Sequence, residues 1–128
     1  MTTEVSQVFI IEDDENIATI FKAAMDQAGL TSEIIPDGQT ALEHLANKTP
    51  NAIILDLHLP FVSGNEILTY LRANKRLAKT RVIVASADVL EVEHLQEEGY
   101  ETLLKPVGFR QMYALAVQLR DSGAGMVE

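Results

Sequence analysis

The sequence predicts an α/β protein built on a doubly wound parallel sheet of five strands. Short apolar runs of strand length alternate along the chain with segments in which apolar residues recur at helical spacing, which is typical of this fold class. The run at residues 52–56 is apolar on both faces, as expected for a central parallel strand covered by helices on both sides. Four of the five expected strands end at a polar group, which indicates a functional edge of the sheet.

The segment before the central strand is expected to contain two strands and two helices. Residues 7–11 form the first strand, and a helix at 16–28 ends at Gly29, because glycine readily adopts the left-handed conformation of a helix terminus. The second strand covers 32–35, and a short helix covers 39–47. The residues expected on the buried faces are Ile17, Ile20, Phe21, Ala24 and Ala28 in the first helix and Ala41, Leu42, Leu45 and Ala46 in the second.

The segment after the central strand is expected to contain two more strands and three helices. Ser63 is an N-cap candidate for the first of these helices. The fourth strand covers 81–86, a short helix covers 89–98, the fifth strand covers 101–104, and the last helix covers 108–120. The residues expected to face the core are Ile67, Leu68 and Leu71 in the helix after Ser63, and Phe109, Met112, Ala116 and Leu119 in the last helix.

Length and composition indicate one globular domain over residues 1–128, with a core at about 6–121 and a flexible tail at 122–128. Hydrophobic residues are 47% of the chain and charged residues 23%, which argues against disorder. Cysteine is absent, which excludes a disulfide framework and a thiolate zinc site. We find no signal-like N-terminus and no apolar run of bilayer-spanning length, so a cytoplasmic protein without a membrane partner is expected.

The charge balance bears on the kind of partner. The formal net charge is -9, from 19 acidic and 10 basic residues. Such an acidic protein is not expected to bind a nucleic-acid phosphate backbone directly.

Polar side chains at the strand ends form the candidate site. They are Glu12, Asp13 and Asp14 after the first strand, Asp56 at the end of the third, Ser86 at the end of the fourth, and Lys105 after the fifth. Ligands of open parallel sheets bind outside the carboxyl ends of the strands, so these groups are expected in one crevice. Neighbouring carboxylates repel one another unless a cation lies among them, and oxygen ligands near phosphate suit Mg²⁺. The same cation and Lys105 would neutralise an incoming phosphoryl group that a carboxylate attacks.

This ordered set, ending in Lys105-Pro106, resembles the receiver domain of two-component response regulators, and the resemblance covers nearly the whole chain. Asp56-Leu-His-Leu-Pro60, followed by Gly64, is similar to the family's phosphoacceptor loop. The resemblance implies a flavodoxin-like sheet with strand order 2-1-3-4-5 and five helices.

The resemblance also implies how the crevice is used. Asp56 is then the phosphoacceptor, which receives its phosphoryl group from a phosphohistidine of a sensor histidine kinase or of a histidine phosphotransfer protein. Asp13 and Asp56 bind Mg²⁺ directly, Glu12 binds it through a water, and His58 contributes its main-chain carbonyl.

Two further groups are implied to contact the phosphoryl oxygens, namely the Ser86 hydroxyl and the Lys105 ammonium. Ser86 is also a candidate N-cap of the following helix, and it could serve in both ways. The rim of the pocket is expected to contain Asp14, the His58 side chain and Ala87.

The sequence departs from the family pattern at Thr102, which stands where the family usually carries Tyr or Phe. Thr102 is too small to repeat the inward turn of that ring, which normally follows phosphorylation. Tyr100 lies two residues earlier, on the same face of an ideal strand, and is a candidate substitute. The interval from Ser86 to Lys105 is also short, so the helix between them must be short or displaced.

The expected function is that of a phosphorylation-controlled receiver in a phosphorelay, which signals by altered protein–protein interaction. It is not expected to be an enzyme beyond self-phosphotransfer and autodephosphorylation. The alternatives are a scaffold that ignores phosphorylation, motivated by Thr102, and a small aspartyl-phosphate phosphatase, for which His58 replaces the required second acid. A flavin-binding protein is disfavoured because the loop after the first strand is acidic.

The downstream protein partner stays open. So does the choice between a stand-alone receiver and the receiver part of a larger protein. A monomer or a weak dimer is expected.

Overall fold

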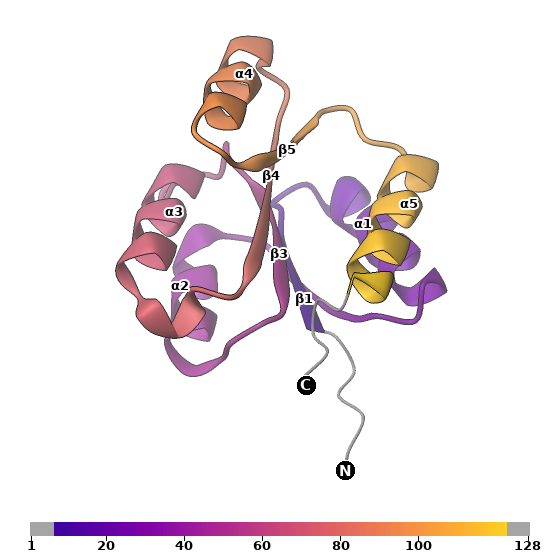
Figure 1. The fold of residues 1–128 in the computed structure, drawn as a ribbon, viewed down its shortest axis with the longest axis horizontal. Helices are drawn as coiled ribbons and strands as arrows, with labels where there is room; N and C mark the ends of the chain where they lie inside the picture. Colours follow the sequence, from indigo (N-terminus) through magenta and orange to yellow (C-terminus); the bar gives the residue numbers. More distant parts are fainter. Residues whose placement is uncertain (1–6, 123–128) are drawn as a thin grey trace.

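The sheet has five parallel strands in the order β2-β1-β3-β4-β5 (Figure 1). The structure is a computed structural model that describes residues 7–122, so most of the predicted tail lies outside the described residues. The strands are β1 (Gln7–Ile11), β2 (Thr31–Ile35), β3 (Ala52–Asp56), β4 (Arg81–Ser86) and β5 (Glu101–Leu104). The predicted fold class and strand order are therefore confirmed.

Helices cover both faces of the sheet. They are α1 (Glu15–Gln27), α2 (Gly38–Asn47), α3 (Gly64–Ala73), α4 (Val89–Glu97) and α5 (Phe109–Asp121), with a short 3₁₀ turn, η1 (Lys75–Leu77), after α3. Figure 1 shows α1 and α5 together on one side of the sheet and α2 and α3 on the other. In residues 7–122, no helix combines the length and the apolar character that crossing a membrane requires.

The two faces of the sheet bury separate hydrophobic clusters because successive strand residues point to opposite sides. On the α1/α5 side the cluster includes Val8, Ile10, Phe21, Ile54 and Met112. On the α2/α3 side it includes Phe9, Ile11, Leu45, Ile53 and Ile67. The two central strands, β1 and β3, are thus apolar in both directions and fix the site residues that follow them.

Three predicted core positions are wrong. Ile20 is 41% exposed because the buried stripe of α1 runs through Ala18, Phe21 and Met25, which leaves Ile20 on the outer side. Ala46 is exposed on α2. Phe109 is 42% exposed at the first turn of α5 and stacks on Tyr113 instead, with the ring centroids 6.1 Å apart.

The fourth helix is short, as expected, and it buries only Val92 and Leu95. It begins at Val89, which is 52% exposed, and its next residue, Leu90, is 75% exposed. The helix is therefore attached to the sheet by few apolar side chains, so its first turn depends on polar contacts.

Gly64, the first residue of α3, packs against the loop that follows β3. A Cβ atom there would lie 2.6 Å from Leu57 Cα and 2.9 Å from the Asp56 carbonyl oxygen. Ser63 caps the helix from the preceding position, since its hydroxyl accepts a hydrogen bond from the Glu66 amide at 3.2 Å, which confirms the predicted cap. The absence of a side chain at Gly64 lets α3 brace the main chain beside Asp56.

We predict that Gly64→Ser lowers the free energy of unfolding by on the order of 2 kcal/mol, because the new Cβ would overlap main-chain atoms that cannot move aside. Gly108→Ser is the matched control, since a Cβ at Gly108 meets nothing within 4 Å. Urea denaturation of both variants measures the difference. Equal stabilities would show that the loop after β3 adjusts freely.

Candidate functional site

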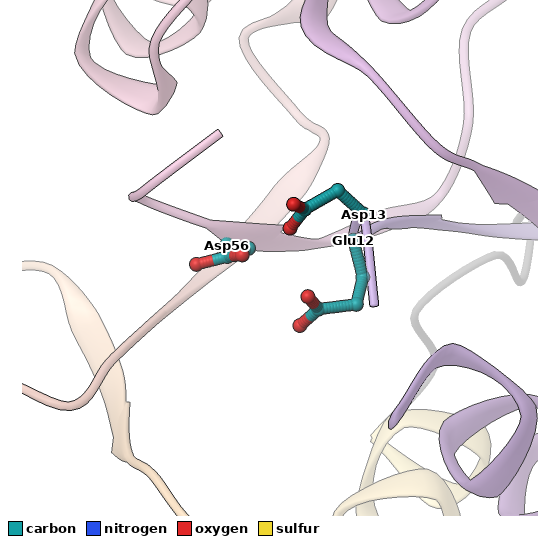
Figure 2. A group of neighbouring side chains, drawn as sticks. All are labelled: Glu12, Asp13 and Asp56. Atoms are coloured by element: carbon teal, nitrogen blue, oxygen red, sulfur yellow. The ribbon is translucent and has the colours of Figure 1, made fainter. Parts of the chain in front are cut away.

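Three carboxylates meet where β1 and β3 end. Glu12, Asp13 and Asp56 each offer an oxygen, and these oxygens lie within 4.8 Å of one another (Figure 2). The register explains the meeting, because Ile11 of β1 pairs with Leu55 of β3 and the acidic residues are the next ones along each strand. Glu12 is 3% exposed and Asp56 is 5% exposed, whereas Asp13 faces solvent.

Lys105 reaches the same place from the loop after β5. Its ammonium nitrogen is 2.9 Å from Glu12 Oε1 and 3.5 Å from Asp56 Oδ2. The main chain holds Lys105 at this edge through a 2.8 Å hydrogen bond from its amide to the Ser86 carbonyl, and the Lys105-Pro106 peptide bond that follows is cis. Glu12 Oε1 is buried, and within residues 7–122 its polar contact is this ion pair with Lys105.

Burial dominates the electrostatics of Glu12 and raises its pKa to about 7 from 4.5. The charge of Asp56 raises this pKa further, while Lys105 and the Asp14 amide lower it. Burial alone would lower the pKa of Lys105, but its contacts with Glu12 and Asp56 outweigh burial and raise that pKa. One ammonium among three carboxylates leaves the site with an excess of negative charge when all are ionised.

These side chains line a cavity of about 340 Å³. Its walls also contain Asp14, His58 and Ala87, where the rim was expected, and Ile17, which was not expected there. The His58 amide donates a 3.1 Å hydrogen bond to Asp56 Oδ1, which orients the Asp56 carboxylate within its own loop. Asp14 caps α1, since its carboxylate accepts hydrogen bonds from the amides of Asn16 and Ile17.

Ser86 is fully buried and does not line this cavity. Its hydroxyl donates a 2.6 Å hydrogen bond to Glu91 Oε1 and accepts one from the Asp88 amide at 3.0 Å. The same Glu91 oxygen is 2.7 Å from His58 Nε2. Ser86 is not the N-cap of α4, because Asp88 takes that position and accepts hydrogen bonds from the Leu90 and Glu91 amides.

The sequence interpretation overlooked Glu91. The signal was present, since Asp88 and Glu91 have the spacing of a capping box, in which the acidic residue turns back toward the preceding loop. In the structure Glu91 turns back further than that motif requires and reaches the strand end at Ser86.

Thr102 and Tyr100 both lie away from the acidic cavity. The Thr102 hydroxyl accepts a 2.9 Å hydrogen bond from the Gln96 side chain of α4. Tyr100 packs against the α2/α3 cluster, and its hydroxyl accepts a hydrogen bond from Arg72 of α3. Tyr100 thus connects the edge strand with α3.

The chain is similar to two longer regulatory proteins. The chain is 28% identical over 109 residues to the DNA-binding transcriptional regulator NtrC of Escherichia coli strain K12, which covers 84% of this chain and 23% of that protein. It is 26% identical over 109 residues to the sensory transduction protein RegX3 of Mycolicibacterium smegmatis, which covers 85% of this chain and 48% of that protein. The chain therefore spans less than half the length of these two relatives.

Solved structures show the same fold. The chemotaxis response regulator CheY4 of Vibrio cholerae superposes with a TM-score of 0.79 at 19% identity, over 90% of this chain and 98% of that one. The profile of the response regulator receiver domain family matches residues 8–117. That range includes every strand end of the acidic cavity, and the chain therefore belongs to the response regulator receiver domains of two-component signal transduction.

Proposed function

We propose that the protein is a phosphorylation-controlled receiver in which Asp56 accepts a phosphoryl group in a Mg²⁺-dependent reaction. The observation that carries this proposal is the position of Asp56, a buried carboxylate beside two further acids and 3.5 Å from an ammonium. Receiver domains of this family are phosphorylated by sensor kinases. The donor proposed for this chain is a phosphohistidine of a sensor histidine kinase or of a histidine phosphotransfer protein.

The residues present fit a bound Mg²⁺ ion. All the available donors are oxygen atoms, as Mg²⁺ prefers, and the single Lys105 ammonium beside Glu12 and Asp56 does not balance the three carboxylates. Asp13 and Asp56 would hold the ion directly, the His58 main-chain carbonyl would add a ligand, and Glu12 would act through a water. When bound, the ion supplies positive charge that offsets the repulsion between Asp56 and an anionic phosphoryl group.

The chain's own groups account for the rest of the transfer. An Asp56 carboxylate oxygen attacks the phosphorus atom and forms a P–O bond while the P–N bond to the donor histidine breaks, and the electron pair of that bond stays on the histidine nitrogen. The Lys105 ammonium already lies 3.5 Å from Asp56 Oδ2. It can therefore leave Glu12 and pair with an oxygen of the new phosphoryl group.

The proposed output is a changed protein–protein contact in the cytoplasm. A scaffold that ignores phosphorylation is the second candidate, and the position of Thr102, hydrogen-bonded to Gln96 outside the cavity, favours it. The two functions differ in whether Asp56 is modified at all.

We predict that incubation with a small phosphodonor and Mg²⁺ adds one phosphoryl group to the wild type and none to Asp56→Asn, which lacks the nucleophilic carboxylate. Intact-mass measurement detects the addition. Asp26→Asn, a change of the same kind on the exposed side of α1, is the control and should be modified like the wild type. No addition to the wild type, even from a range of phosphohistidine proteins, would favour the scaffold.

Mg²⁺ is predicted to raise the melting temperature of the wild type, because a ligand that binds only the folded state stabilises it by about 2.7 kcal/mol at a hundred times its Kd. Asp13→Asn should lose most of this response because a direct ligand loses its charge. Asp26→Asn, which removes an exposed carboxylate of α1 outside the cavity lining, should keep the response. Equal responses of the two variants in thermal denaturation would argue against Asp13 as a ligand.

A third prediction concerns pH in the absence of Mg²⁺. The pKa of Glu12 is about 7 in the folded state, and its ordinary value is 4.5. Between these two pH values the folded state keeps the proton on Glu12, whereas the unfolded chain loses it. The stabilisation that the folded state gains from holding this proton on Glu12 is fully present below pH 4.5 and is lost as the pH rises through 7.

Relative to Glu12→Gln, which does not titrate, the wild type should therefore lose on the order of 2 kcal/mol of unfolding free energy across this window. Urea denaturation in EDTA at several pH values measures the difference between the two proteins. A difference that does not change with pH would contradict the assignment.

A further inference from the structure

We propose that Glu91 is a positioning residue that holds the Ser86 hydroxyl away from the phosphoryl site, so that binding of a phosphoryl group at Asp56 must break the Ser86–Glu91 hydrogen bond. The inference rests on the proposed function of Asp56. It adds a residue on α4 whose release accompanies phosphorylation.

The first step of the argument is the hydrogen-bond capacity of Ser86. A hydroxyl has one proton to donate. In the structure Ser86 donates that proton to Glu91 Oε1 at 2.6 Å, and its oxygen also accepts the Asp88 amide at 3.0 Å. While the bond to Glu91 persists, Ser86 has no proton to offer to a phosphoryl oxygen.

The second step is the position of Glu91 relative to the pocket. Its Oε1 atom accepts from Ser86 and lies 2.7 Å from His58 Nε2, so one carboxylate oxygen ties β4 to the loop that follows Asp56. The Glu91 side chain is 25% exposed and the His58 side chain 63% exposed, so the charge-assisted bond from the buried Ser86 hydroxyl is the better shielded of the two contacts. Glu91 Oε1 thus contacts both Ser86 and His58, the two residues that lie between Asp56 and α4.

The third step is charge. A phosphoryl group on Asp56 adds negative charge and strong acceptor oxygens to a cavity that His58 lines, next to the end of β4 where Ser86 lies. Glu91 then competes with the phosphoryl group for the single Ser86 proton, and the two anions repel each other. Release of Glu91 removes both conflicts.

The structure also has a place for the released carboxylate. A cavity of about 650 Å³ lies between α3 and α4, and its walls include Glu91 itself together with Arg72, Tyr100 and the pair of His94 and Glu98, which are 3.4 Å apart. Arg72 offers a positive charge there and already donates a hydrogen bond to the Tyr100 hydroxyl. Movement of Glu91 into this cavity would shift the first turn of α4, a route of signal output that does not require an aromatic residue at position 102.

The test is a titration of Mg²⁺-saturated protein with beryllium fluoride, a phosphoryl analogue, followed by NMR. Glu91→Ala should bind the analogue on the order of threefold to tenfold more tightly than the wild type, because one hydrogen bond no longer has to be broken. Glu93→Ala, the same change at an exposed position of the same helix, is the matched control and should bind like the wild type.

The Ser86 hydroxyl provides the decisive comparison. In a Ser86→Ala background the additional Glu91→Ala change should give a clearly smaller gain, since no hydroxyl is left to be freed and only the repulsion between the two anions is relieved. A gain of undiminished size without Ser86, or equal affinities of Glu91→Ala and Glu93→Ala, overturns the role of Glu91 while leaving Asp56 as the acceptor. A wild type that binds no analogue overturns the proposed function and this inference together.

Circular dichroism checks that each variant folds. If Glu91→Ala does not fold, Glu91→Gln takes its place. Its amide oxygen is an uncharged and weaker acceptor, so the gain in affinity should have the same sign and a smaller size.

Discussion

The contact of one lysine with two buried carboxylates is the interaction on which the site depends. Lys105 lies between Glu12 and Asp56 at the carboxyl edge of the sheet, and the acids are nearly removed from water. A buried ion pair contributes little net stability, because the cost of desolvating the charges offsets their attraction. The raised pKa of Glu12 shows that this cost is not fully offset here. The pocket is therefore arranged so that an added cation relieves an existing electrostatic penalty.

The fold supplies the rigidity that this arrangement needs. β1 and β3 are buried on both faces, so the residues that follow them cannot move far without exposing apolar side chains. Gly64 lets α3 approach the main chain of Asp56 and Leu57 closely, and this contact supports the loop that follows β3. By contrast, α4 buries only two side chains and holds the strand end through Glu91. The rigid side of the site carries the acceptor, and the weakly attached side carries the group proposed to move.

The sequence predicted the sheet well, because each strand is a continuous apolar run bounded by polar residues. The bounds of β1, β3, β4 and β5 agree with the prediction, and the strand-end groups Glu12, Asp13, Asp56 and Lys105 do meet. Helix faces were less predictable. Ile20 and Phe109 are apolar but lie outside the buried stripe, and helical spacing alone does not show where the neighbouring layer ends.

The contacts of Ser86 could not be predicted, because they depend on the rotamer of one side chain on α4. A hydroxyl at a strand end is compatible with a helix cap, with a phosphoryl contact and with a bond to Glu91. The rotamer of Glu91 decides among them.

A crystal structure of the wild type with Mg²⁺ and beryllium fluoride tests the central claim most directly. The account predicts the analogue bonded to an Asp56 carboxylate oxygen, the metal between Asp13 and Asp56, and the Lys105 ammonium moved from Glu12 to a fluorine atom. A structure in which the analogue binds elsewhere, or in which the contact between Lys105 and Glu12 persists beside an occupied Asp56, would contradict it.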